Sequence, residues 1–136
     1  AGLVAPGRLE ALTLLDCPQL TTVGTASLPT AVRQLQIRGC GFADLAGFAL
    51  PAGCEVVTIR ACDQLTALDG LTLPEAIGSL TIADNPRLTS LDGVTGLASL
   101  GRLVITGNTA LGDAVAEAFA AGLEVTGLQV IEGNGP

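Results

Sequence analysis

The side chains of this 136-residue chain that could carry chemistry are thirteen carboxylates and four cysteines, and histidine is absent. Without histidine, the Ser-His-Asp and Cys-His arrangements of nucleophilic enzymes cannot form, so proton transfer would fall to carboxylates. Asp69 and Asp92 stand 23 residues apart, each directly before a glycine. Because an aspartate before glycine accepts the local N–H bonds of a turn, turns are the expected role of this pair, and a weak calcium site is the alternative. The sequence predicts no catalytic residue and no enzymatic activity.

The cysteines follow one another at spacings of 23, 14 and 8 residues, unlike the Cys-x-x-Cys pairs of zinc sites. No metal or cofactor is therefore predicted. We expect Cys17, Cys40 and Cys62 to be buried thiols, because free cysteine packs as a small hydrophobe, and Cys54 to be a core residue of a strand. A disulfide such as Cys40 to Cys62 is the alternative, since equivalent Cα atoms of neighbouring strands lie about 4.8 Å apart.

A recurring apolar pattern positions these residues, and it reads apolar-x-x-apolar-x-apolar-x-x-(Cys/Asn). Its last two apolar residues alternate with polar ones, which is typical of a short strand with one buried face. The regular copies are Leu9-Leu12-Leu14-Cys17, Val32-Leu35-Ile37-Cys40, Cys54-Val57-Ile59-Cys62, Ile77-Leu80-Ile82-Asn85 and Leu100-Leu103-Ile105-Asn108. Val125, Leu128 and Val130 form a sixth, less regular copy. Each copy predicts one strand of a parallel sheet.

The final position of the pattern predicts a structural ladder in the bend after each strand. Its members are Cys17, Cys40, Cys62, Asn85 and Asn108. An asparagine amide both donates to and accepts from the backbone of neighbouring coils, and cysteine is small enough to fill the same space.

Turn glycines recur every 23 residues, at Gly24, Gly47, Gly70 and Gly93. Glycine adopts positive φ without a Cβ clash, so these positions predict one bend made four times. A period of this size indicates a solenoid.

The strings (Ile/Leu)-x-x-Leu-x-Ile-x-x-Asn-x-x-Leu at 77–88 and 100–111 resemble the leucine-rich repeat consensus, and LTSLDGVTGLASL at 88–100 resembles its bacterial secreted, receptor-L-domain-like variety. The resemblance covers roughly residues 9–134. Together with the repeat it implies an α/β solenoid: a right-handed coil with one parallel β-sheet and one helix near the C-terminus. About six coils of 22–23 residues would begin near 9, 32, 54, 77, 100 and 125, within a single domain spanning 1–136. The resemblance also implies a secreted or cell-surface location, whereas unpaired cysteines favour the alternative, the cytoplasm.

The one helix is expected at 111–123, with Asp113 serving its N-terminus and Gly122 ending it in a left-handed conformation. Residues 111–136 would cap the stacked core. The first coil has no equivalent cap, so we expect the rest of a longer chain or a second copy to cover it.

Six arginines against thirteen acids give a net charge of −7, which argues against nucleic acid and anionic lipid as partners. No apolar run is long enough for a membrane span. Only three aromatic residues occur, so a binding face would be polar or aliphatic.

Two outward columns are predicted on the sheet: Thr13, Gln36, Thr58, Thr81, Val104 and Gln129, and Leu15, Arg38, Arg60, Ala83, Thr106 and Ile131. The candidate binding residues among them are Gln36, Arg38, Thr58, Arg60, Thr81 and Thr106. The two arginines could meet a carboxylate or an acidic glycan, while ordinary pairing with Asp63 and Glu55 is the competing interpretation. Arginine and glutamine interrupt the threonine column, which argues against an ice-binding face.

These features favour a non-catalytic repeat scaffold that binds a protein or glycan at the cell surface through its sheet face. The alternative is a structural subunit that assembles head to tail into a fibre or coat.

Overall fold

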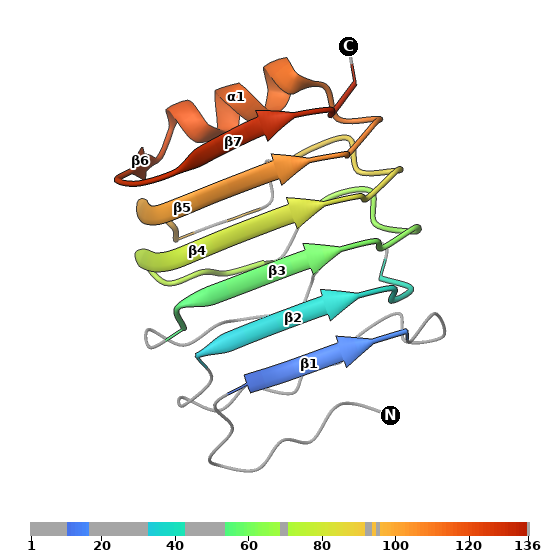
Figure 1. Ribbon diagram of the computed structural model, residues 1–136, viewed down its shortest axis with the longest axis horizontal. Coiled ribbons are helices and arrows are strands. Elements are labelled where there is room, and N and C mark those ends of the chain that lie inside the picture. Colours follow the sequence, from blue (N-terminus) through green and yellow to red (C-terminus); the bar gives the residue numbers. More distant parts are fainter. Residues whose placement is uncertain are drawn as a thin grey trace.

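The computed structural model describes residues 11–16, 33–42, 54–68, 71–91, 94 and 96–135. These residues form a solenoid of about four turns in which every strand belongs to one parallel sheet (Figure 1). The elements are β1 (Ala11–Leu15), β2 (Gln34–Arg38), β3 (Val56–Arg60), β4 (Ala76–Ala83), β5 (Ser99–Thr106), α1 (Asp113–Ala121), β6 (Glu124–Val125) and β7 (Gln129–Glu132).

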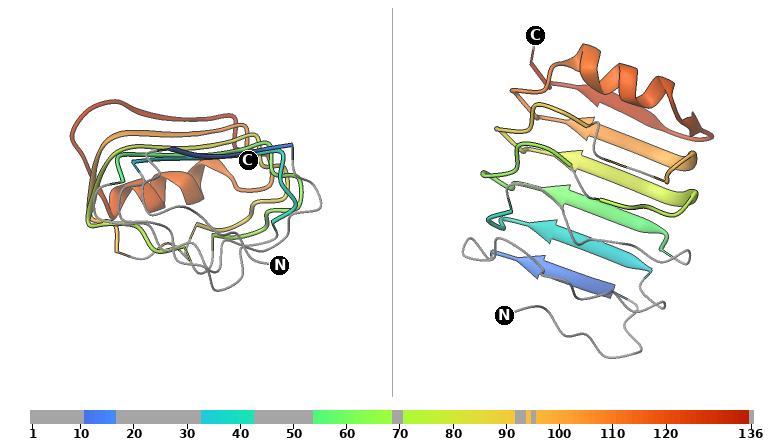
Figure 2. Two further views of the ribbon diagram at one scale, coloured as in Figure 1. Left: turned by 90° about the horizontal axis from the view of Figure 1, so that it is seen from below. Right: turned by 180° about the vertical axis from the view of Figure 1, so that it is seen from behind.

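The strands stack in chain order, and β6 and β7 share the last row because both pair with β5. Seen along the stacking direction, the coils nearly superpose, with the sheet along one side (Figure 2). The return segment of the last coil contains α1, which packs against β6 and β7. The described part is thus a β-solenoid with one helix, and about four turns are described where six coils were expected.

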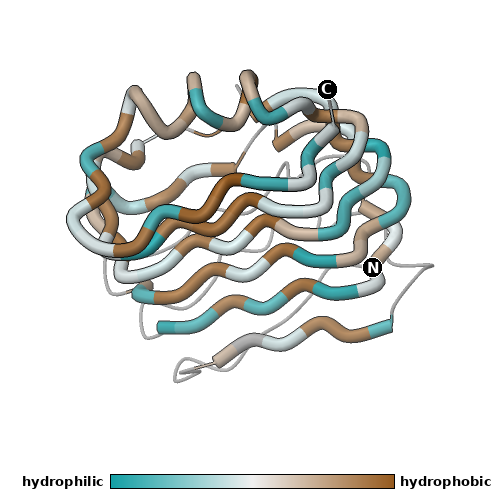
Figure 3. Tube along the Cα trace, turned by 45° about the horizontal axis from the view of Figure 1, so that its top comes forward, coloured by the Kyte–Doolittle hydropathy of each residue, from teal (hydrophilic) through white to brown (hydrophobic). Residues whose placement is uncertain are grey.

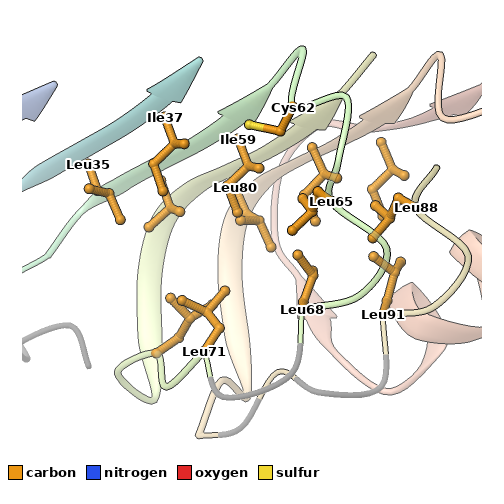
Figure 4. Close-up of a cluster of buried hydrophobic side chains, with 14 of the residues drawn as sticks. Leu35, Ile37, Ile59, Cys62, Leu65, Leu68, Leu71, Leu80, Leu88 and Leu91 are labelled. Carbon is orange, nitrogen blue, oxygen red and sulfur yellow. The ribbon is translucent and has the colours of Figure 1, made fainter. Parts of the chain in front are cut away.

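The core lies between the sheet and the return segments. Alternate strand residues point inward, which appears as alternating colours along the strands in Figure 3. One inward column runs through every row: Leu14, Ile37, Ile59, Ile82, Ile105 and Ile131. Leucines of the return segments, including Leu65, Leu68 and Leu88, meet the strand side chains from the opposite side and are fully buried (Figure 4). The period-two pattern therefore selects the buried face of each strand.

The sixth copy of the pattern is displaced by one residue from its expected register. Val125 pairs with Leu100, as expected, but Ile131 rather than Val130 pairs with Ile105. The segment between β6 and β7 contains one extra residue, and Leu128 is 51% exposed instead of buried. The outward columns therefore end in Val130 and Glu132, where Gln129 and Ile131 were expected.

The helix is shorter than predicted at both ends, and its two caps differ from expectation. Gly122 has φ −83°, because its N–H continues the helical turn by donating to the carbonyl of Phe119. The prediction that Gly122 ends the helix in a left-handed conformation was therefore wrong. At the other end Gly112 is the N-cap residue and no side chain caps the helix. Asp113 is the acidic residue of the first turn, where it complements the helix dipole.

The predicted turn glycines Gly24, Gly47, Gly70 and Gly93 lie outside the described residues, as does Cys17. Among the described residues, positive φ recurs in a column directly after the strands. Its members are Asp16, Gly39, Ala61, Asp84, Gly107 and Gly133, with φ between 52° and 69°. In every row but the last, the N–H of this residue donates to the carbonyl at the strand end of the next row, for example Gly39 to Arg60 at 3.2 Å and Asp84 to Thr106 at 3.0 Å. The chain therefore turns the same corner in each row.

Candidate functional site

The outward face of the sheet brings the predicted binding residues together in aligned rows. Gln36 pairs in register with Thr58, and Thr58 with Thr81. Arg38 is the register partner of Arg60. Thr106 lies further away, because Ala83 separates its row from that of Arg60.

The centre of this face is flat and uncharged. Thr58, Thr81, Val104 and Val130 occupy one column and are half-buried, while Ala83 beside them is 5% exposed. Short side chains in register project to similar heights above a parallel sheet. The centre can therefore contact a broad surface.

Charged side chains lie on this face at the carboxyl ends of β2 and β3, at Arg102 on β5 and at Glu132 on β7. Arg60 Nε donates to Asp84 Oδ2 at 3.2 Å, and both side chains are about half exposed. The acid that pairs with Arg60 belongs to the next row, so pairing with Asp63 or Glu55 is not what the structure shows. Arg38 is exposed, and no described acid forms an ion pair with it.

Beneath the face, the predicted ladder is continuous through its asparagine rungs. Asn108 Oδ1 accepts from the backbone N–H and from Nδ2 of Asn85, both at 3.1 Å. Asn108 Nδ2 donates to the carbonyl of Ile82 at 3.0 Å. Asn85 repeats the arrangement one row earlier, accepting from the N–H of Cys62 and donating to the carbonyl of Ile59. Each of these asparagine side chains thus satisfies two buried backbone groups of the preceding row.

Sequence reasoning missed two members of this ladder, Asn134 and Asp113. Asn134 Oδ1 accepts from the N–H of Asn108 at 3.2 Å and from its Nδ2 at 2.9 Å. Asp113 Oδ1 in turn accepts from the N–H of Asn134 at 3.1 Å and from its Nδ2 at 2.9 Å. Asn134 follows Ile131 by the same three residues that separate Asn108 from Ile105, so the correct register would have found it.

The described cysteines are buried free thiols, and Cys40 and Cys62 form no disulfide. Cys62 Sγ lies 3.5 Å from the carbonyl oxygen of Arg60, and Cys40 Sγ lies 3.5 Å from that of Leu14. Desolvation by burial raises the pKa of both the Cys54 and Cys62 thiols, and for Cys62 a hydrogen bond from the backbone of Cys40 opposes the rise. Thiols held protonated in this way are poor nucleophiles and poor metal ligands.

Within the described residues, no group of three or more acidic or cysteine side chains is arranged to hold a metal ion. No helix in the described part of the chain is long and apolar enough to cross a membrane. A shallow apolar hollow lies beside α1, lined by Leu91, Ala114, Val115, Ala118 and Phe119.

Comparison of the chain with protein-family models, with curated proteins and with solved structures found no match.

Proposed function

We propose that this protein is a non-catalytic solenoid scaffold that binds another macromolecule, a protein or a glycan at a cell surface, through the outward face of its sheet. The observation that carries the proposal is the in-register face itself. Its half-buried centre of threonine and valine is flanked by the exposed arginines 38 and 60. Solenoid proteins use such extended surfaces for binding.

The proposal includes the leucine-rich repeat class, with about six coils of 22–23 residues, and a secreted or cell-surface location. The ladder supports the repeat assignment, because Cys62, Asn85 and Asn108 are 23 residues apart and the backbone N–H of each of the first two donates to the Oδ1 of the next.

A large charged side chain in the middle of the face tests the proposal. Wild-type protein is screened against a glycan array and a displayed library of extracellular protein fragments, and each binder is retested with Thr81→Arg. We expect Thr81→Arg to abolish binding and Ala118→Arg, an exposed control on α1, to leave it unchanged. A binder whose affinity is unchanged by Thr81→Arg would contradict a site on the sheet face. So would a binder whose affinity falls equally with Thr81→Arg and Ala118→Arg.

The alternative is head-to-tail assembly of copies into a fibre or coat. It is favoured by the arrangement of the described strands, since β1 and β7 lie at opposite ends of one parallel sheet. An exposed leucine lies near each end: Leu15 is 48% exposed and Leu128 is 51% exposed. Light scattering after size separation, over a concentration series, distinguishes the two. Mass that grows with concentration supports assembly, and a constant monomer mass supports the binding module.

A further inference from the structure

We propose that the rows of β2 and β3 form a docking site for an acidic segment of a protein partner, whose carboxylates bridge Arg38 and Arg60. The inference rests on the proposed function, because it specifies the partner of the same face.

The first observation is a local excess of positive charge on an acidic protein. The chain carries a net charge of −7. The outward residues of these two rows are nevertheless Gln34, Gln36 and Arg38 on β2 and Val56, Thr58 and Arg60 on β3, without an acid. An acidic partner would therefore be repelled by most of the surface and attracted to this part of the sheet, which gives the site specificity.

The second observation is the opposition of Arg38 and Arg60, which are direct register partners on neighbouring parallel strands. Like charges at such positions destabilise a sheet. Asp84 compensates Arg60 from the next row. No described acid does the same for Arg38, because the position that stands to Arg38 as Asp84 stands to Arg60 is occupied by Ala61. Arg38 therefore contributes no ion pair to the described fold. A carboxylate from a partner would relieve its repulsion with Arg60.

The third observation is the set of neighbours around the two guanidinium groups. Gln36 and Thr58 stand two residues before them on the same face and supply hydrogen-bond donors. Leu15, 48% exposed, is the register partner of Arg38 on the other side. Guanidinium groups bind carboxylates through paired hydrogen bonds, and clustered arginines recognise acidic protein motifs. A protein segment offers both the carboxylates and the aliphatic groups that suit this site.

The test is a nuclear magnetic resonance titration of the whole chain with a hexaglutamate peptide, with hexaglutamine as the neutral control. Hexaglutamate is expected to shift the amides of Gln36, Arg38, Thr58 and Arg60, and its affinity is expected to fall as salt is raised. Arg38→Gln should weaken binding about tenfold, the loss of one charge-assisted contact. Arg87→Gln makes the same charge change in the exposed turn after β4 and should leave the affinity nearly unchanged.

Two further variants separate binding from a structural role. Asp84→Asn releases Arg60 from its ion pair and should strengthen peptide binding about threefold, while Glu117→Gln on α1 controls for the same change in net charge. Arg38→Gln should leave the unfolding midpoint unchanged or raise it, because the arginine pair is unfavourable. A lower midpoint would assign Arg38 to the fold and overturn the inference.

The outcome also distinguishes this inference from the proposed function. The same titration with a polygalacturonate fragment tests an acidic glycan as the partner. Shifts induced by this fragment but not by hexaglutamate would overturn an acidic protein segment as the partner. A loss of hexaglutamate affinity that is equal for Arg87→Gln and Arg38→Gln would do the same. If partners recovered in the screen are lost with Thr81→Arg but are insensitive to Arg38→Gln and to salt, the binding face stands and the acidic partner is wrong. If no partner is lost with Thr81→Arg, the proposed function itself is wrong.

Discussion

Replacing Asn108 by alanine should cost this protein a large part of its stability. The Asn108 side chain is fully buried and makes four hydrogen bonds: it donates to Ile82 and Asn134 and accepts twice from Asn85. Alanine leaves two backbone groups, the Ile82 carbonyl and the Asn85 N–H, without their side-chain partner. Each unsatisfied buried group costs about 1–3 kcal/mol. We therefore expect a loss of about 3–4 kcal/mol, a large share of the roughly 5–15 kcal/mol that stabilises a typical domain.

The matched variant is Asn108→Cys, because the chain already places cysteine at this position in other rows. Cys40 Sγ lies 3.5 Å from the Leu14 carbonyl oxygen of the preceding row, the equivalent of the Ile82 carbonyl at Asn108, and the Cys62 thiol receives a backbone hydrogen bond from Cys40. The cysteines thus make a weaker version of the asparagine arrangement. Asn108→Cys should thus cost about half as much as alanine. Thr109→Ala, exposed in the following turn, should stay within about 0.5 kcal/mol of wild type.

Urea unfolding followed by circular dichroism measures the three free energies. A loss below about 1 kcal/mol for Asn108→Ala would refute the ladder as a principal source of stability. Equal losses for alanine and cysteine would show that the thiol does not replace the hydrogen bonds of the amide.

The remaining predictions concern a turn, the thiols and the end of the ladder. Gly107→Ala should destabilise by about 1–2 kcal/mol in thermal unfolding, because φ is 68° and the new Cβ meets a carboxylate of the preceding row, whereas Gly122→Ala, at φ −83°, should be neutral. Cys54 and Cys62 should be alkylated only on unfolding, as mass spectrometry would show. Because the pKa of both thiols is raised in the fold, the free energy of unfolding should fall as the pH rises above roughly 8.5, where the thiols of the unfolded chain ionise first. Asp113→Ala should increase amide hydrogen exchange in α1 and β7 without changing exchange in β2, and uniform change would contradict a local role.

The inward strand positions could be predicted because burial on one face imposes a period of two, as in Leu35, Ile37, Val57 and Ile59. The last row could not be placed in the same way. One extra residue between β6 and β7 shifts the register, and a shift by one exchanges the inward and outward faces of a strand, so Ile131 was expected outward.

The corner after each strand escaped prediction because residues of different types share it. Gly39 and Gly107 tolerate positive φ without strain, but Ala61 and Asp84 adopt it as well, which hides the column in the sequence. The ion pair of Arg60 was also missed for a spatial reason. Its partner is 24 residues away in sequence and one row away in space, so a search among sequence neighbours pointed to other acids.

The ladder has a direction, and its last member bears on how the protein is used. In Asn108 and Asn134, Oδ1 accepts from the backbone N–H and the Nδ2 of the preceding rung, while Nδ2 donates onward to the next. Asp113 accepts from Asn134 in the same two ways, so its carboxylate occupies the place that a further asparagine rung would take. An ionised carboxylate has no proton to donate, so the ladder stops there. A second copy stacked at this end would have to bind without the ladder that joins the coils, which favours the binding module over the head-to-tail assembly.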